Sequence, residues 1–416
     1  MSNDIEWKLV RLSTVSSKSA TKGTTPTSIG YDFEKTGINF IKIESITDNG
    51  LFEKNKFAYI SEVCNDMLRR SQLQENDILF SIAGALGRVA IVKKDILPAN
   101  TNQALSIIRL NMKLVDVSFI SFILNSSFIG SQIKENKKGN VQQNLSLTQI
   151  DNLLIPIPYK NGAPDLETQK QIAQKLGDMD SLIAAKEKLL AKKRNLKVAA
   201  MQKLIKDEEG ENWKKVKLGE ITQVFSGGTP STERPDYWNG EIPWMNSGEL
   251  NLKIVNEVEG RISELGLKSS STHWIPKGCV LIGLAGQGKT RGTAAYNTIP
   301  LCTNQSIAAI YPNEKVFNSK YLYFYFDTQY ASLRELSSGG GGRGGLTKTH
   351  LLKYEIPIPY KNGSPDINEQ RRIASILSDM DSEIAAIEKE ITKLQNLKTA
   401  MMQKMFCFGD SDSSSE

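Results

Sequence analysis

The sequence is poor in the residues that build metal centres and disulfide frameworks. Its 416 residues include only four cysteines and two histidines. The cysteines lie far apart, without the spacing of a zinc site or of a secreted disulfide framework. Two histidines also make a histidine–serine–acid catalytic arrangement implausible. We therefore expect no metal and no cofactor.

Long apolar runs are missing as well. No run reaches the ~18 residues that cross a bilayer, and the N-terminus reads MSNDIEWK, which does not resemble a signal peptide. We expect a cytoplasmic protein without a membrane partner. Charged residues make up 24% of the chain and the net charge is +6. This mild basic excess permits nucleic-acid binding without demonstrating it.

One segment has the letters of a phosphate-binding loop. Gly283–Thr290 reads GLAGQGKT, which matches the G-x-x-x-x-G-K-[ST] pattern of nucleotide-binding enzymes. Such a loop needs a helix that begins at the lysine and directs its N-terminus at the phosphates. The residues that follow read RGTAAYNTIPL, and their glycine, β-branched residues and proline are poor helix formers. We predict a buried strand, a glycine turn and a second strand, and keep a P-loop nucleotide-binding enzyme as the alternative.

The most informative feature is a tandem repeat. At Ile155 begins a block that reads IPIPYKNGAPDLETQKQIAQKLGDMD, and at Ile356 begins one that reads IPIPYKNGSPDINEQRRIASILSDMD. About three-fifths of some fifty positions are identical, without a gap. Upstream of each block the match is weaker, as in TKGTTPTS and FSGGTPST, or TNQALS and TNQSIA. We predict variable domains at 1–154 and 210–355, repeated regions at 155–209 and 356–409, and a disordered tail at 410–416.

Each copy of the block predicts one long helix. An Asn-Gly turn follows IPIPY, an aspartate comes next as N-cap, and about 38 residues then run without proline. Such a helix would be about 55 Å long and needs a long partner, for which its own repeat, running antiparallel, is the obvious candidate. An amphipathic helix on a globular core is the alternative. The candidate interface and partner-binding positions are Ile172, Leu176, Met179, Ile183, Ile373, Leu377, Met380 and Ile384.

The polar and basic residues at predicted turns are the candidate binding residues, since no catalytic motif is convincing. Arginine, lysine, asparagine and glutamine read base edges, and glycine loops let backbone N–H groups approach phosphates. Asn102 and Asn304 could instead cap local structure. The candidates are Lys22, Thr24, Thr25, Arg88, Asn102, Gln103, Lys137, Lys138, Gln142, Gln143, Thr229, Ser231, Arg234, Lys289, Arg291, Asn304, Gln305 and Arg343.

The chain resembles the specificity subunit of type I restriction–modification systems over nearly its whole length. The resemblance rests on the duplication, on GGTPS at Gly227, on the IPIPY block with its DMDS segment, and on helices that end in MQKL and MQKM. The tail CFGDSDSSSE has no counterpart in the first copy, and neither has the GGGG run before Arg343.

The resemblance implies an α+β fold in which two mixed α/β target-recognition domains are joined by two long antiparallel coiled-coil helices, as a pseudo-two-fold tandem repeat. Each domain would read one half of a bipartite target in double-stranded DNA. The helices would set the spacer and dock two adenine methyltransferase subunits, which restriction subunits join. The specificity subunit of the family is not itself an enzyme. A coiled-coil scaffold without a DNA role is a further alternative.

Overall fold

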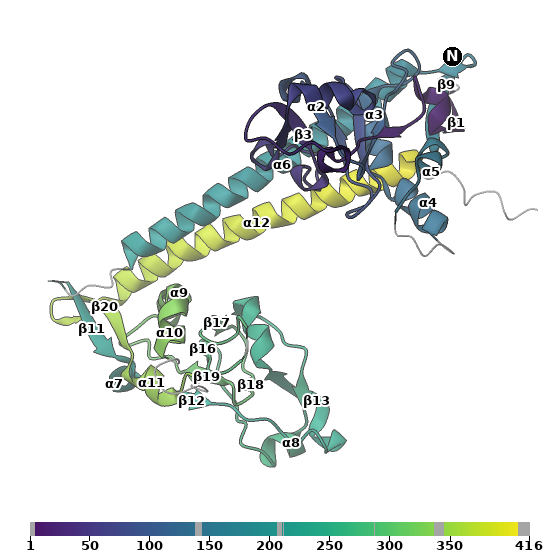
Figure 1. The fold of residues 1–416 in the computed structure, drawn as a ribbon. Helices are drawn as coiled ribbons and strands as arrows, with labels where there is room; N and C mark the ends of the chain where they lie inside the picture. The colour runs from purple at the N-terminus through teal and green to yellow at the C-terminus, as the bar shows by residue number, and fades with distance from the viewer. Residues whose placement is uncertain are drawn as a thin grey trace, which may run out of the picture. The chain divides into compact units, whose positions relative to one another are not determined.

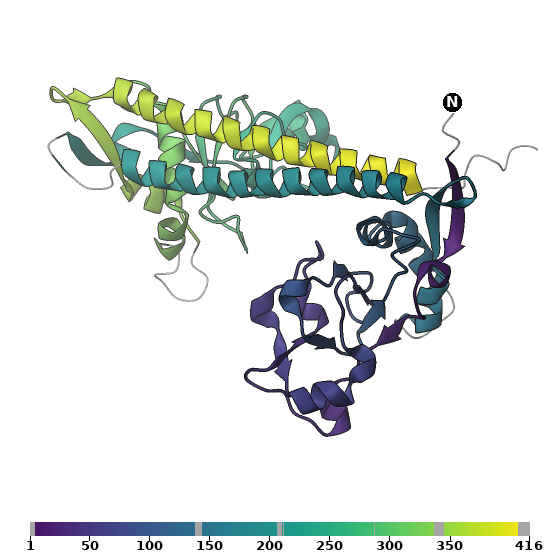
Figure 2. The ribbon, with the colours of Figure 1, turned by 90° about the horizontal axis from the view of Figure 1, so that it is seen from above.

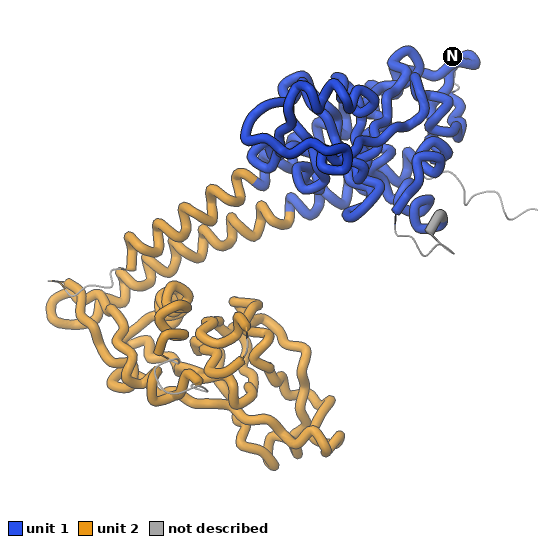
Figure 3. The backbone as a smooth tube through the Cα atoms, in the orientation of Figure 1, with its two compact units in different colours: residues 1–187, 390–416 blue, residues 188–389 orange. Residues whose placement is uncertain are grey.

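The chain forms two compact units, each with one globular part and portions of both long helices (Figure 3). The units are Met1–Glu187 with Glu390–Glu416, and Lys188–Lys389. The structure, a computed structural model, describes residues 5–137, 144–205, 210, 212–286, 288–336 and 345–406, without the side chains of residues 136 and 137. The predicted 410–416 tail and the region of Arg343 lie outside the described residues.

The globular part of the first unit is built on two small sheets. One has the order β2 (Thr21–Lys22), β8 (Leu105–Ile108), β5 (Ile78–Ser81), β6 (Val89–Ile91), and the other has the order β4 (Ala58–Ile60), β3 (Ile38–Ile41), β7 (Ala99–Thr101). Every residue of β5 and β8 is buried, as expected for short runs of β-branched and aromatic residues. The helices here are α1 (Leu12–Val15), α2 (Glu62–Met67), α3 (Val117–Leu124), α4 (Ser127–Lys137) and α5 (Leu147–Asp151).

The second unit repeats this plan. Its larger sheet has the order β12 (Val224–Ser226), β19 (Ile307–Ile310), β16 (Val280–Gly283), β17 (Ala294–Asn297), β14 (Ile254–Val255), and its smaller one has β15 (Arg261–Ile262), β13 (Trp238–Met245), β18 (Cys302–Thr303). As in the first unit, the smaller sheet contains one parallel pair, β13 with β18, which corresponds to β3 with β7. The helices are α7 (Leu218–Ile221), α8 (Glu264–Lys268), α9 (Ser319–Thr328), α10 (Tyr330–Leu336) and α11 (Lys348–Lys353).

The repeated IPIPYKNG segment forms the same structure in both units. Strand β9 (Leu154–Lys160) pairs antiparallel with β1 (Glu6–Arg11) and continues into β10 (Ala163–Pro164), and β20 (Glu355–Lys361) does the same with β11 (Trp213–Lys217) and β21 (Ser364–Pro365). Asn161 and Asn362 have φ of 53° and 52°, and each is followed by a glycine with positive φ. This is the backbone of a two-residue hairpin turn, so the predicted Asn-Gly turn is confirmed.

Two helices, α6 (Leu166–Leu204) and α12 (Ile367–Phe406), are 39 and 40 residues long. Figures 1 and 2 show them side by side. In the first unit Lys398 and Lys186 of this pair of helices bind Asp180 and Glu390, each at 2.5 Å. Because the residue numbers rise along one helix as they fall along the other, the helices are antiparallel there.

The second unit holds its portions of the same helices in the same way. Lys197 binds Asp381 at 2.5 Å, Lys193 binds Glu383 at 2.6 Å, and Arg194 binds Glu388 at 2.5 Å. Ion pairs on a helix surface such as these, which are partly exposed, contribute about 1 kcal/mol or less each. They therefore specify which residues lie opposite one another more than they stabilise the pair.

The start of each long helix follows the prediction of an aspartate N-cap. Asp165 Oδ1 accepts from the backbone N–H of Glu167 at 3.1 Å, and the Thr168 hydroxyl, the largest influence on it, holds the pKa of Asp165 below its ordinary value. Asp366 accepts from the N–H of Glu369 at 3.0 Å. Asp366 and Glu369 have the spacing of a capping box, but only half of the box forms. Glu369 binds Arg372 instead, and the N–H of Asp366 donates to a strand carbonyl.

A buried glutamine joins each helix to its globular part. In the first unit, Gln169 Oε1 accepts from the N–H of Asp116 at 3.0 Å, and its Nε2 donates to the carbonyl of Leu114 at 3.2 Å. In the second unit, Gln370 makes the equivalent bonds to Asn318 and Val316, at 2.8 and 3.1 Å. Both glutamines are 0% exposed. Each satisfies two backbone groups that have no strand partner at the entrance to α3 or α9.

The core of each unit contains residues from both repeats. Phe406, the last residue of α12, is fully buried in the first unit, with its ring centroid 5.9 Å from that of Phe119. Met201, in the last turn of α6, and Ile205, the residue after its end, are buried in the core of the second unit. Each globular part is thus completed by the end of a helix from elsewhere in the sequence.

Replacement of Gln169 by leucine tests this junction. We expect the free energy of unfolding to fall by about 2 kcal/mol or more, because two buried backbone groups lose their partners. The matched control is Gln171→Leu, at an exposed position whose side chain bonds only Glu167 of the same helix, and it should change stability by less than about 0.5 kcal/mol. Urea unfolding followed by circular dichroism measures both. Equal effects of the two substitutions would contradict the assignment.

Candidate nucleic-acid interface

The GLAGQGKT segment is not a phosphate-binding loop. Strands β16 and β17 pair antiparallel, with Ile282 opposite Ala294, so Lys289 is followed by a strand where the motif requires a helix. Arg334 of α10 donates to the carbonyl of Gly288 at 2.6 Å and holds the turn. The predicted strand–turn–strand is confirmed, and the nucleotide-binding alternative loses its physical basis.

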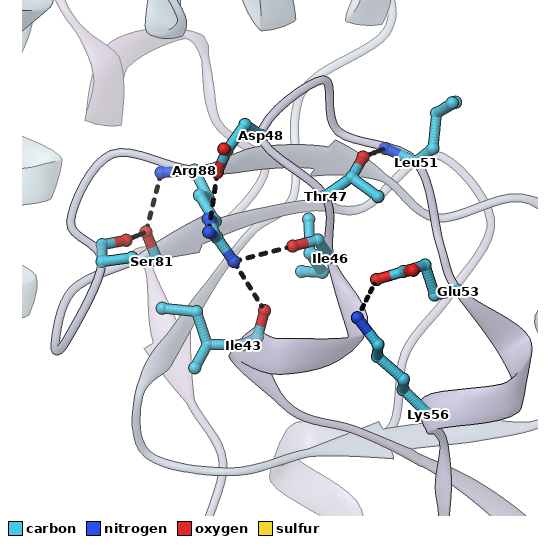
Figure 4. Close-up of polar contacts among 10 residues, drawn as sticks. Ile43, Ile46, Thr47, Asp48, Leu51, Glu53, Lys56, Ser81 and Arg88 are labelled. Carbon is cyan, nitrogen blue, oxygen red and sulfur yellow. Dashed lines mark hydrogen bonds and ion pairs between the residues drawn. The ribbon is translucent and has the colours of Figure 1, made fainter. Parts of the chain in front are cut away.

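The corresponding hairpin of the first unit is held by Arg88 (Figure 4). Its guanidinium donates to the carbonyls of Ile46 and Ile43, at 2.9 and 3.4 Å, and binds the Asp48 carboxylate at 2.6 Å. The N–H of Arg88 donates to the Ser81 hydroxyl at 2.7 Å. Arg88 therefore joins two loops of the unit. Contact of Arg88 with DNA stays a prediction. The guanidinium N–H groups that bind Ile43, Ile46 and Asp48 would have to bind the DNA as well.

Two other loops of the first unit are brought together by a threonine and a glutamine. The Thr25 hydroxyl donates to Gln103 Oε1 at 2.6 Å, and the glutamine is exposed. A Cβ at Gly23 would lie 1.7 Å from the carbonyl oxygen of Thr101. Only glycine therefore allows the two loops to approach so closely.

The second unit contains the same arrangement. The Thr229 hydroxyl donates to Gln305 Oε1 at 2.5 Å, and Gln305 is exposed. A Cβ at Gly227 would lie 2.0 Å from the carbonyl oxygen of Thr303. We call these two arrangements the clasps. The first clasp consists of Gly23, Thr25, Asn102 and Gln103, and the second of Gly227, Thr229, Asn304 and Gln305.

The asparagines of the clasps shape their turns. Asn102 Oδ1 accepts from the N–H of Ala104, and Asn304 Oδ1 accepts from the N–H of Ser306, both at 3.1 Å. The alternative that these residues cap local structure is therefore confirmed. By closing the turn, each asparagine fixes the backbone of the glutamine beside it.

Around the first clasp lie further candidates. Lys22 is exposed. Thr24 lines a pocket of about 390 Å³ together with Tyr31, Met67 and Arg70. The last three were not among the candidates from the sequence. Their segments lie outside the repeated block and have no clear echo in the second copy, so no sequence signal could have identified them.

The second unit presents its candidates on other loops. Ser231 is exposed, and Arg234 binds Asp236 at 2.7 Å, with its guanidinium 4.8 Å from the centroid of the Tyr237 ring. Asp236 raises the pKa of Arg234 above its ordinary value. This arginine is thus charged and partly neutralised by its own neighbour.

Lys289 lies on the β16–β17 loop. It is exposed and lines a pocket of about 270 Å³ with Lys253 and Asp327, which bind each other at 2.7 Å. Arg291 is partly buried on the same loop. Lys253 was not among the candidates from the sequence, and its φ of 63° is unusual for a residue other than glycine.

Some candidates lie outside the described residues. These are the side chain of Lys137 and the residues Lys138, Gln142, Gln143 and Arg343. DNA contact stays a prediction for the other candidates, which are Lys22, Thr24, Thr25, Arg88, Asn102, Gln103, Thr229, Ser231, Arg234, Lys289, Arg291, Asn304 and Gln305.

The apolar helix positions differ in what buries them. Ile172 and Leu176 are buried in the core of the first unit, and Ile373 and Leu377 in that of the second. Ile183 is 9% exposed, whereas Met179, Met380 and Ile384 are half-buried. The four core side chains are covered by the chain's own globular parts, and a contact of the eight helix positions with a partner subunit stays a prediction. A heptad pattern predicts that one face of a helix is buried, but it does not indicate whether a globular core, another helix or a partner protein covers that face.

Other chemistry finds little support in the part of the chain that the structure describes. That part contains no group of three or more His, Cys, Asp or Glu side chains able to hold a metal ion. None of its helices has the length and apolar character to cross a membrane. Burial raises the pKa of Cys279 to about 12 and that of Cys302 to about 11, so neither thiol is a reactive nucleophile at neutral pH.

Comparison with known proteins shows that both halves of the chain match one family profile. The sequence profile of the type I restriction modification DNA specificity domain matches residues 4–192 and 210–396. The chain is 30% identical over 233 residues to the EcoR124I/EcoR124II specificity subunit of Escherichia coli, a match that covers 55% of each chain. It is 26% identical to a putative type I restriction enzyme MjaX specificity subunit of Methanocaldococcus jannaschii over 89% of this chain and 86% of that one.

The fold also has solved counterparts. The S subunit of a type I restriction–modification system from M. genitalium superposes with a TM-score of 0.59 at 17% identity, covering 99% of this chain and 98% of that one. A chain from a structure of a type I R-M system gives a TM-score of 0.61 at 20% identity, over 96% and 97% of the two chains. Since the profile matches both halves of the sequence, the chain belongs to the family of type I restriction–modification DNA specificity subunits.

Proposed function

We propose that the chain is the non-catalytic subunit that gives a type I restriction–modification complex its DNA sequence specificity. Each globular part reads one half of a bipartite target in double-stranded DNA. The observation that carries this proposal is the presence of one sheet plan and one clasp in both units, while the loops around the clasps differ. Two sites with the same framework and different surrounding loops are what the recognition of two different half-sites requires.

The long helices support the proposed spacer role. Asp180–Lys398 in one unit and Asp381–Lys197 in the other are the same pair of repeat positions with the helices exchanged. Each lysine also lies 5.3 Å from the ring centroid of a phenylalanine, Phe122 or Phe324. We infer an antiparallel coiled coil with pseudo-two-fold symmetry that sets the separation of the half-sites.

The same symmetry bears on the partners. A surface made by the repeated regions exists twice, so a protein that binds it binds in two copies. Two adenine methyltransferase subunits, docking on exposed faces of the helices, fit this expectation, and restriction subunits would join that core. The segment boundaries at 154/155, 209/210 and 355/356 are part of the proposal. They mark changes in sequence similarity, whereas the compact units divide within the long helices.

The proposed function predicts a split methylation motif. The chain is co-expressed with the adenine methyltransferase subunit proposed as its partner, and methylated adenines are mapped across the host DNA. We expect one bipartite motif with an unspecified spacer, which disappears when this chain is omitted. An assembled complex that methylates no such motif would leave a scaffold without a DNA role.

Insertion into the helix tests the spacer role. Four residues inserted near Ala191 lengthen α6 by about 6 Å. We expect the spacer of the methylated motif to change, or the complex not to assemble, while both half-site sequences stay the same. A changed half-site would contradict the proposal, because the recognition loops lie outside the insertion.

A further inference from the structure

We propose that Gln103 and Gln305 contact the DNA backbone of the two half-sites, through Nε2 donors that Thr25 and Thr229 direct outward. This inference rests on the proposed function and assigns it a pair of positioning residues. It separates two roles among the candidates, since the clasps would hold the duplex while the loops beside them read base edges.

The orientation of each amide follows from its hydrogen bond. A glutamine side chain has one oxygen acceptor and one NH₂ group with two donors. The threonine hydroxyl donates to Oε1 in both clasps, at 2.6 and 2.5 Å. This bond holds the oxygen against the protein, so the NH₂ group faces away from the threonine. Within the described residues, neither Nε2 has a hydrogen-bond partner, and both glutamines are exposed.

The clasps are positioned by the fold and not by chance contacts of side chains. In each unit a glycine brings the threonine loop against the backbone of the glutamine loop, and an asparagine closes the turn that carries the glutamine. Donors held in a fixed position suit a group of the ligand whose position does not vary from one target sequence to another.

The two clasps have the same threonine and glutamine, and this sameness indicates which part of the DNA they contact. The two halves of an asymmetric target differ in sequence, so groups that read bases should differ between the units. Neighbouring positions do differ: Lys22 corresponds to Ser226, and Thr24 to Gly228. The threonine and the glutamine do not. What two unlike half-sites share is the sugar–phosphate backbone, whose oxygens accept hydrogen bonds from neutral side chains as well as from charged ones.

The alternative is that the Thr25–Gln103 hydrogen bond only holds the two loops together and has no role in DNA binding. The variant Gln103→Glu separates the two. A carboxylate still accepts from the Thr25 hydroxyl, so the tie between the loops is kept. The outward NH₂ group becomes an oxygen with negative charge, which a phosphate repels. The matched control is Gln74→Glu, which adds the same charge at another exposed glutamine of the first unit.

The test uses the assembled complex with its methyltransferase and a duplex that carries the mapped motif. For Gln103→Glu we expect an unchanged thermal midpoint, affinity for the duplex reduced by at least about tenfold, and an unchanged methylation motif. Gln74→Glu should stay within about twofold of the wild type. Gln305→Glu, the twin in the second unit, should reproduce the loss.

Three results would overturn the inference. Wild-type affinity of Gln103→Glu would show that the amide does not contact DNA. Relaxed sequence preference at one base of a half-site would make the glutamine a base reader. A loss of affinity equal to that of Gln74→Glu would reduce the effect to net charge. Absence of binding by the wild-type complex would instead refute the proposed function, and this inference with it.

Discussion

Each globular core depends on a helix end that comes from the other repeat. Phe406 closes the core of the first unit, although the rest of that core lies more than two hundred residues earlier in the chain. Met201 and Ile205 have the same task in the second unit. Burial of a phenylalanine or isoleucine side chain contributes about 1.5–3 kcal/mol. The packing of each core therefore depends on the pairing of the two long helices, and neither globular part is complete without both of them.

Polar contacts then fix how each globular part is attached. The buried glutamines, Gln169 and Gln370, bind backbone groups just before α3 and α9. The edge strands β1 and β11 pair with the repeated strands that lead into the long helices. These contacts attach each globular part firmly to the helix that follows it. Such attachment is a requirement if the helices set the separation of two half-sites, as we propose.

Much of the framework could be predicted from the sequence because it depends on local rules. The Asn-Gly turns, the aspartate N-caps and the uninterrupted helices follow from backbone preferences that need no knowledge of tertiary contacts. The rejection of the phosphate-binding loop was predictable for the same reason, since the residues after Lys289 could not form a helix.

The remaining features depend on contacts distant in sequence. Nothing in the heptad pattern indicates that Ile172 and Leu176 face a globular core and not a partner protein. Gln169 lies among charged residues on a helix and gives no sign that it is buried. Arg88 has the character of a DNA-binding residue, and only the structure reveals its bonds to Ile46 and Asp48. In the candidate interface, therefore, the residue types indicate candidates, and their contacts within the chain cannot be deduced from the sequence.

The central claim is that the two units read two half-sites independently on one scaffold. It is tested most directly by replacing residues 210–355 with the corresponding domain of a relative and mapping methylated adenines in host DNA. The account predicts that one half of the motif changes, while the other half and the spacer stay the same. A change in both halves, or in neither, with the complex shown to assemble, would contradict it.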